Sequence, residues 1–433
     1  MIRQLLSVAL MGGLCAGALV PQAQNREDKV RNDKKKIEAA GYWVYNDVAK
    51  GFAEAKATGK PLLVVLRCIP CEECVKLDDD LIDADERLKP LLEKFVRVRV
   101  ISTNGLDLSQ FQFDTDQSFA VFLMNGDGTL YGRFGTRSHR TSWLDDVSVQ
   151  GMGKALEGAL ALHSAYPKSK AALAAKRGPQ PEFLRPETFP SLKGKYTSAI
   201  SYEGKVVPTC IHCHMIGDAT RELAFSRKVK LAEATLFPYP HPKTLGLILD
   251  PKESATLLRV QPGSDAQKAG FQAGDQILTL EGQPLLSIAD VQWVLNSTSA
   301  DGATLKASVR RAGKLLPLAL KLAPGWRQRD DISWRASTWG LRRTALGGMK
   351  LDPAPSGPGL LVQNVGQFTP HDLAKRAGIV KGDVLLSVDG RSNFTRESEV
   401  ITYALWEKKA GDTLNLTLVR NGNKIEASFV LPG

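Results

Sequence analysis

The sequence predicts a multidomain protein in which one α/β domain is followed by two mainly-β domains. A short apolar run at residues 62–66 is rich in branched side chains and follows Gly59-Lys60-Pro61, which indicates a fully buried strand. Further alternating runs, which predict the rest of a sheet, lie at residues 95–101, 119–124 and 129–134. The segment AGFQAGD at 269–275 recurs as AGIVKGD at 377–383, each time followed by similar strands, so the last part of the chain is a duplicated domain.

Length and composition fit this reading. A chain of 433 residues has room for about three domains, and contents of 43% apolar and 24% charged residues are those of a globular protein. The net charge of +11 is interpreted as a basic surface, because no Lys/Arg cluster lies in a nucleic-acid motif; no nucleic-acid partner is expected. The expected divisions are a signal peptide (1–23), a charged linker or leading helix (24–40), the α/β domain (41–166), a connector (167–238), the first β domain (239–325), a linker (326–337) and the second β domain (338–433).

The N-terminus predicts export. Arg3 precedes an apolar segment at residues 5–20, and Ala16-Gly17-Ala18 offers a small-x-small cleavage site, as in secretory signal peptides. We therefore expect a bacterial periplasmic or envelope protein with no transmembrane span in the mature chain. Loss of Cys15 with the signal would leave five cysteines, and an odd number favours redox or cofactor chemistry over a disulfide-stapled scaffold.

The first cysteine motif, C-x-x-C-x-x-C, comprises Cys68, Cys71 and Cys74 and follows the apolar run at 62–66 directly. Residues 72–81 have helical spacing, so the strand would deliver the cysteines to a helix N-terminus, where unpaired N–H groups stabilise a thiolate. Such an arrangement is typical of a dithiol redox site. It resembles the thioredoxin-like fold, and so do the lead-in Tyr45-Asn46-Asp47, the helical stretch 48–57 and the hairpin around residues 126–128. The chain departs from that family at Ser118-Phe119-Ala120, where a proline usually faces the dithiol.

The second cysteine motif reads Cys210-Ile211-His212-Cys213-His214 and matches C-x-x-C-H, the attachment pattern of c-type haem. In that interpretation the two thiols form thioethers to the haem, His214 ligates the iron, and His241 is a candidate for the sixth ligand. Two alternatives stay open. One is a structural or redox disulfide between Cys210 and Cys213, and the other is a metal site that also uses His212.

The duplicated AG-x-x-x-GD segments and their flanking strands resemble PDZ domains of the bacterial HtrA type. The resemblance implies that each domain adds an extended peptide to a sheet edge, with its C-terminal carboxylate held by a loop. The matching loops would be Leu245-Gly246-Leu247 and Trp339-Gly340-Leu341. The far wall of each groove would be a helix, at residues 288–295 and 399–405, with Val291, Leu295, Val400 and Ala404 as pocket residues or as ordinary core. No GNSGG-like nucleophile loop accompanies them, so a protease is not expected.

Taken together, these features resemble a family of bacterial thioredoxin/PDZ proteins, some of which carry selenocysteine at the position of Cys68. The resemblance implies that Cys68 attacks, Cys71 resolves the mixed disulfide, and Cys74 is an alternative partner. The first hypothesis is an exported thiol–disulfide oxidoreductase that has a redox partner protein and binds extended or C-terminal peptides. The alternatives are a non-catalytic envelope adaptor, and an electron-transfer protein with covalent haem.

Overall fold

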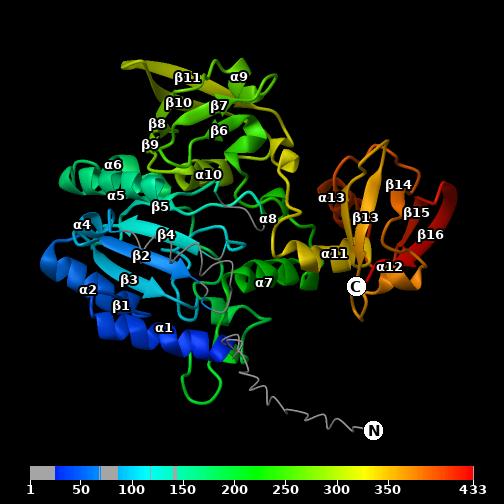
Figure 1. Cartoon of the computed structure of the whole chain (residues 1–433), viewed down its shortest axis with the longest axis horizontal. Helices are drawn as coiled ribbons and strands as arrows, with labels where there is room; N and C mark the ends of the chain where they lie inside the picture. The colour runs from blue at the N-terminus through cyan, green and yellow to red at the C-terminus, as the bar shows by residue number, and fades with distance from the viewer. Residues whose placement is uncertain (1–24, 68, 70–85, 118, 140–143, 433) are drawn as a thin grey trace, which may run out of the picture.

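A computed structural model describes residues 25–67, 69, 86–117, 119–139 and 144–432 (Figure 1). The thioredoxin-like domain is built on a five-stranded sheet with the order β1-β3-β2-β4-β5. In this sheet β1, β3, β2 and the outer strand β5 run in the same direction, and β4, between β2 and β5, runs antiparallel to them. The strands are β1 (Val44–Tyr45), β2 (Leu62–Arg67), β3 (Val96–Val100), β4 (Phe119–Met124) and β5 (Leu130–Phe134). The strands predicted from the four apolar runs are thereby confirmed.

Helices cover both faces of this sheet. Every residue of β2 is buried, because one apolar cluster lies on each side of the strand. The long helix α5 (Val149–Ser164) packs on one face, and α2 (Val48–Thr58) contacts β2 and β3. The short helix α4 (Lys89–Leu92) leads into β3. The α/β layering expected for the first domain is therefore present.

For the charged segment 24–40 the sequence left a linker and a leading helix open, and the structure has the helix. The segment forms helix α1 (Arg26–Ala40), capped by the Asn25 side chain, which accepts the N–H of Asp28 at 2.8 Å. Val30 and Ile37, seven residues apart, share one buried face, and Asp33 pairs with the buried Arg99 at 3.1 Å.

The connector 167–238 is described throughout and contains one longer helix and several short helical turns. Its elements are α6 (Lys170–Leu173), η2 (Ala174–Lys176), η3 (Pro186–Thr188), η4 (Val207–Thr209), α7 (Cys213–Ser226) and α8 (Glu233–Leu236). Its last residues, Leu231, Leu236 and Phe237, belong to the core of the C-terminal domain. Across the described residues, none of the helices is both long enough and apolar enough to cross a bilayer.

The first β domain, PDZ1, lies against the thioredoxin-like sheet (Figure 1). Its elements are η5 (Pro242–Leu245), β6 (Leu247–Leu249), β7 (Leu257–Val260), α9 (Asp265–Lys268), β8 (Gln276–Leu280), β9 (Gln283–Pro284), α10 (Ile288–Asn296), β10 (Ala303–Arg311) and β11 (Lys314–Leu322). Among the described strands β6 pairs only with β7, and η5, which leads into β6, contacts α10. The helix predicted at 288–295 is confirmed.

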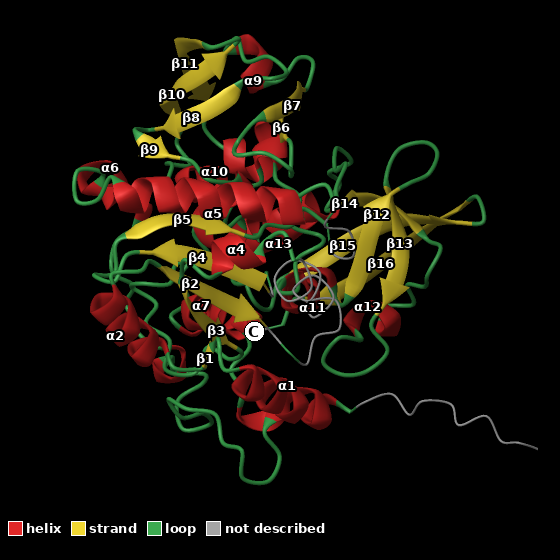
Figure 2. Ribbon diagram, turned by 60° about the vertical axis from the view of Figure 1, so that its left-hand side comes forward, coloured by secondary structure: helices red, strands yellow, loops and turns green. Residues whose placement is uncertain are grey.

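The second β domain, PDZ2, stands apart from PDZ1 at the other end of the molecule (Figures 1 and 2). Its elements are α11 (Thr338–Leu346), β12 (Met349–Pro353), β13 (Leu360–Val365), α12 (Leu373–Arg376), β14 (Val384–Val388), α13 (Glu397–Glu407), β15 (Thr413–Arg420) and β16 (Asn423–Val430). Its sheet has the order β12-β13-β14-β15-β16, so β12 is an edge strand.

The repeated AG-x-x-x-GD motif is explained by a shared ion pair. Asp275 accepts two hydrogen bonds from Arg311, at 2.6 and 2.7 Å, and the same guanidinium donates to the carbonyl of Gly270. Asp383 and Arg420 repeat this geometry in PDZ2, with bonds of 2.7 Å. The motif therefore fixes the turn before β8 and β14, and it plays a structural part in each domain.

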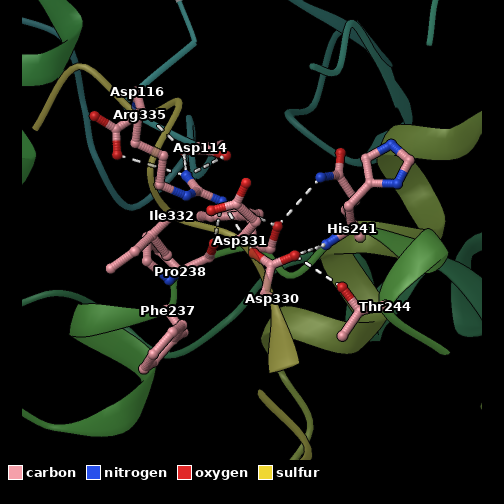
Figure 3. Close-up of polar contacts among 12 residues, drawn as sticks. Asp114, Asp116, Phe237, Pro238, His241, Thr244, Asp330, Asp331, Ile332 and Arg335 are labelled. Carbon is pink, nitrogen blue, oxygen red and sulfur yellow. Dashed lines mark hydrogen bonds and ion pairs between the residues drawn. The ribbon is translucent and has the colours of Figure 1, made fainter. Parts of the chain in front are cut away.

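The segment 326–337 joins the two PDZ domains and is largely buried. It begins with η6 (Trp326–Arg329), and Trp326 and Ile332 belong to hydrophobic cores. Figure 3 shows the guanidinium of Arg335 beside Asp114 and Asp116 of the thioredoxin-like domain, with Asp330 close by. Arg335 donates to both carboxylate oxygens of Asp114 at 2.8 Å. This segment thus ties three parts of the molecule together.

Candidate functional site

The first cysteine motif begins where β2 ends. Cys68, Cys71 and Cys74 lie outside the described residues, but their neighbour Ile69 is described and is 2% exposed. Ile69 belongs to a small buried cluster (the Ile69 cluster) with Val30, Ile101, Ile200, Val206 and Cys210. The chain next to the first motif therefore packs with a cysteine of the second motif, about 140 residues later in the sequence by the numbering.

The second motif is held at the carboxyl ends of the parallel strands. Thr103, just after β3, donates its N–H (3.0 Å) and its hydroxyl (2.8 Å) to the carbonyl of Ile211. The N–H of Ile211 is in turn donated to Asn104 Oδ1 at 2.8 Å. Because sites of α/β sheets form at the carboxyl ends of the strands, this loop occupies a position where chemistry is expected.

The Cys210 thiol is poorly suited to attack. It is 3% exposed and lies 3.5 Å from the carbonyl oxygen of Val206, and burial raises its pKa to about 11. At neutral pH it is therefore a thiol and not a thiolate, as for buried structural cysteines. Cys210 is a free cysteine, so the disulfide to Cys213 considered above is not formed in this structure. Cys213 is the first residue of α7 and is 9% exposed.

Beside C-x-x-C-H the described residues leave a cavity much smaller than a haem. The cavity beside the motif, lined by residues that include Leu66, Ile101 and Cys213, measures about 10 Å³, which is room for roughly one water molecule. The side chain of His214 is half exposed and its Nδ1 lies 3.4 Å from Asp218 Oδ2. His241, the candidate sixth ligand, is buried elsewhere, with Nε2 3.3 Å from Asp146 Oδ1.

His212, the additional ligand of the metal-site alternative, is partly buried beside His214. Burial and the neighbouring His214 lower the pKa of His212 to about 4, so His212 is neutral at physiological pH. Its ring stacks on that of His214, with 6.0 Å between centroids. No group of three or more His, Cys, Asp or Glu side chains with metal-binding geometry occurs within the described parts of the chain.

PDZ1 has the predicted loop in the predicted place. Gly246 ends η5 with φ +83°, and a Cβ there would lie 2.2 Å from the Ser264 side chain, so only glycine fits. Leu245 and Leu247 on either side are buried in the domain core, and so are Val291 and Leu295 of α10. These four side chains of the predicted peptide site are therefore part of the PDZ1 core.

The thioredoxin-like domain covers the PDZ1 groove helix. Asp290 of α10 accepts the N–H of Arg133, at the end of β5, and pairs with the fully buried Lys176 at 2.8 Å. Trp293 donates its indole N–H to the carbonyl of Ala175, and the guanidinium of Arg133 lies 3.8 Å from its ring centroid. PDZ1 is thus an integral neighbour of the thioredoxin-like sheet.

The mouth of the PDZ1 groove is covered too. Ser148, at the start of α5, donates its hydroxyl to the carbonyl of Pro251, just beyond β6, at 2.8 Å. Lys243, in the turn before the loop, pairs with Asp146 at 2.7 Å. An extended peptide that left the groove past β6 would meet these residues of the thioredoxin-like domain.

In PDZ2 the predicted peptide loop was wrong. Trp339, Gly340 and Leu341 lie inside helix α11, where Trp339 stacks on the His371 ring and Leu341 is core. The carbonyl of Gly246 accepts the N–H of Gln261, the residue after β7, and the carbonyl of Gly348 accepts the N–H of Gly366, the residue after β13. Gly348 therefore corresponds to Gly246. Sequence spacing misplaced the loop because α11 is longer than η5, and the short glycine-containing pattern fitted both places.

PDZ2 also contains a buried ion pair that sequence reasoning missed. Glu397, the first residue of α13, accepts two hydrogen bonds from Arg342 of α11, at 2.9 and 2.7 Å, and one from the backbone N–H of Leu351 in β12, at 2.8 Å. The predicted pocket residues Val400 and Ala404 follow on the same helix and are buried. Aligning the two copies at their helix starts would have set Glu397 against Ile288, and this exchange of an apolar for an acidic residue was the available signal.

Comparisons with known proteins agree with this architecture. Residues 43–126 match a family model described as thioredoxin-like, and residues 243–322 and 343–431 match the PDZ domain model. The periplasmic pH-dependent serine endoprotease DegQ of Escherichia coli (strain K12) is 31% identical over 141 residues, which are 33% of this chain and 29% of DegQ. The regulator of sigma-E protease RseP of the same organism is 40% identical over 74 residues, or 17% of this chain and 16% of RseP.

The chain thus spans about three tenths of the length of DegQ and less of the length of RseP. Among solved structures, the HtrA3 PDZ domain bound to a phage-derived ligand (FGRWV) is 24% identical and covers 19% of this chain and 80% of its own, with a TM-score of 0.16. The HtrA-type protease AlgW with tripeptide is 13% identical and covers 30% and 52%, with a TM-score of 0.19.

Proposed function

Because the chain combines a thioredoxin-like domain with two PDZ domains, we propose that it is an exported thiol–disulfide redox protein whose PDZ domains bring peptide segments of its substrates to the redox domain. The observation that carries the proposal is the position of C-x-x-C-x-x-C directly after β2, a buried parallel strand of that domain. Strand ends of this kind are where α/β domains place their chemistry.

The proposed reaction uses the first two cysteines. The Cys68 thiolate attacks a substrate disulfide, forms a mixed disulfide and releases one substrate thiolate. The Cys71 thiolate then attacks the sulfur of Cys68 and releases the second substrate thiolate, which leaves a Cys68–Cys71 disulfide. Two electrons pass from protein to substrate, and an external dithiol partner protein returns them. Cys74 is the alternative resolving residue.

Export rests on the N-terminal sequence and on the periplasmic relatives. Arg3, the apolar segment 5–20 and the small residues at 16–18 form the proposed signal peptide. DegQ, to which part of this chain is similar, is named as a periplasmic protein. N-terminal sequencing of protein from a periplasmic extract tests this step, and an intact N-terminus in the cytoplasm would contradict it.

Insulin-disulfide reduction with an added dithiol tests the redox proposal. We expect turnover by the wild type, loss of at least 90% of the rate in Cys68→Ser (roughly the loss of an essential nucleophile), and an unchanged rate in Cys210→Ala. The absence of turnover in the wild type would instead favour the second candidate, a non-catalytic adaptor. That candidate is favoured by the sequence Ser118-Phe119-Ala120 at the start of β4, which lacks the proline that usually faces the dithiol in thioredoxins.

A visible spectrum separates these proposals from the haem alternative. Because the cavity beside the C-x-x-C-H loop measures only about 10 Å³, we expect protein exported by a host that attaches c-type haem to be colourless and to have the apoprotein mass. A Soret band that disappears in Cys213→Ala would restore the electron-transfer hypothesis.

A further inference from the structure

The edge of β12 in PDZ2 is occupied by a side chain of the same domain. In an antiparallel edge strand every second N–H points away from the sheet, and Leu351 is one of these, because its N–H is donated to Glu397. The next outward position, two residues later, is Pro353, which has no N–H. A peptide that joined this edge would therefore need the Leu351 donor that Glu397 now holds.

Glu397 cannot leave this position without consequence for Arg342. The side chains of Arg342 and Glu397 are 4% and 1% exposed, and the guanidinium donates two bonds to the carboxylate. The Arg342 guanidinium also donates a hydrogen bond of 2.8 Å to the carbonyl of Ser333. If a neutral ligand displaced Glu397, a buried guanidinium would lose the carboxylate that pairs with it among the described residues, which is strongly unfavourable.

We propose that Glu397 is a built-in competitor for the PDZ2 groove, and that PDZ2 selects extended peptides with an acidic side chain that replaces Glu397 on Arg342. This inference rests on the proposed peptide-binding function. The selected residue is the one whose backbone carbonyl accepts the Leu351 N–H, since it takes the place of Glu397 Oε1. A peptide whose last residue lies opposite Met349, the start of β12, has the residue two before its end opposite Leu351.

PDZ1 lacks this device. Ile288 stands at the start of α10 in the place of Glu397, and it is 4% exposed within the apolar core. Acidic selection is therefore specific to PDZ2, and the two domains carry different determinants at the same position.

The test measures binding of fluorescein-labelled pentapeptides to the full chain. FGRWV carries Arg two residues before its end, and we replace that Arg by Glu (FGEWV) or by Gln (FGQWV). We expect the wild type to bind FGEWV about tenfold more tightly than FGQWV, as a charge-assisted bond to a buried Arg provides. Glu397→Gln, which removes the competing charge, tightens FGEWV binding by a further factor of about ten.

Glu407→Gln is the matched control. It removes the same charge from the same helix, but Glu407 pairs with Arg391 at the surface, where both side chains are half exposed, so peptide affinities should equal those of the wild type. Equal binding of FGEWV and FGQWV by the wild type overturns the selection and leaves peptide binding intact. No binding of any peptide by any variant overturns the peptide-binding function itself, and the selection with it.

Hydrogen exchange provides a readout without peptide. We expect the Leu351 amide to exchange at least tenfold faster in Glu397→Gln than in the wild type, and at the wild-type rate in Glu407→Gln (an estimate based on loss of one charged acceptor). Unchanged exchange at Leu351 would overturn the role of Glu397 as the competitor. The wild-type comparison of the two peptides decides the selection even if Glu397→Gln fails to fold.

Discussion

PDZ1 and PDZ2 have the same fold but close their grooves in different ways. PDZ1 is covered from outside, because the thioredoxin-like domain binds Asp290 and Trp293 of α10. PDZ2 is closed from inside, by the pair of Glu397 and Arg342. The difference indicates that PDZ1 helps to build the core of the molecule, whereas the proposed peptide site of PDZ2 is held by an ion pair within that domain.

The corresponding helix positions show this difference most directly. Asp290 and Glu399 are both the third residue of their groove helix, yet Asp290 is 1% exposed and pairs with Lys176, whereas Glu399 caps its own helix beside Arg396. The same acidic residue therefore serves contact between domains in PDZ1 and local helix stability in PDZ2. Contacts between domains, and not the fold, have diverged.

The largest expected effect comes from breaking the contact between PDZ1 and the thioredoxin-like domain. Asp290→Ala leaves Lys176 as a buried charge without its carboxylate and removes the acceptor of the Arg133 and Leu286 N–H groups. We expect the free energy of unfolding to fall by about 3–5 kcal/mol in urea titrations. Glu399→Ala, the matched change in PDZ2, should cost about 1 kcal/mol. Equal losses would contradict the asymmetry between the domains.

The next effect concerns the contact between segment 326–337 and the thioredoxin-like domain, where Arg335 pairs with Asp114. Burial raises the pKa of Asp114 to about 6, although Arg335 and Asp116 also face it, the first opposing and the second reinforcing the shift. As pH rises from 3.8 to about 6, the unfolded chain releases this proton before the folded protein does, so stability falls over that window and is level above it. The full stabilisation that the raised pKa of Asp114 provides is present only below pH 3.8, the ordinary pKa of the carboxyl.

Asp114→Asn removes this titration. We expect the wild type to lose up to about 3 kcal/mol relative to the variant between pH 4 and pH 6.5, from the shift of roughly two pKa units. Urea midpoints across that pH range provide the measurement, with Asp331→Asn, at an exposed position of the same segment, as the control. Parallel pH profiles for wild type and Asp114→Asn would refute the assignment.

A third effect tests the corrected peptide loop of PDZ2. Gly348 has φ +89°, and a Cβ there would lie 1.8 Å from the carbonyl oxygen of His371, so Gly348→Ala requires movement of backbone. We expect a loss of about 2–4 kcal/mol and of peptide binding by PDZ2. Gly357→Ala, at φ +73° with open space around it, should cost about 1 kcal/mol and leave binding unchanged. Wild-type stability of Gly348→Ala would be inconsistent with this loop.

The sequence predicted the elements well and the contacts between them poorly. Strand β4 was predicted at its observed bounds, because an apolar run between turn residues reports burial directly. The clustering of Ile69 with Cys210, and the pairing of Arg335 with Asp114, join residues that are far apart in the chain and have no periodicity of their own. The peptide loop of PDZ2 was misplaced for another reason. Trp339-Gly340-Leu341 and the segment at Gly348 both look like a turn in the sequence when helix α11 is not recognised.

The smallest effect separates these two loops from the other side. Gly340 lies within α11, its φ is not positive, and an added Cβ would meet nothing within 4 Å. Because alanine loses less backbone freedom in a helix, Gly340→Ala should raise the free energy of unfolding by about 0.5–1 kcal/mol. Peptide affinity for PDZ2 should stay at the wild-type value in the same fluorescence assay. Loss of affinity with unchanged stability would return residues 339–341 to the binding site and remove Gly348 from it.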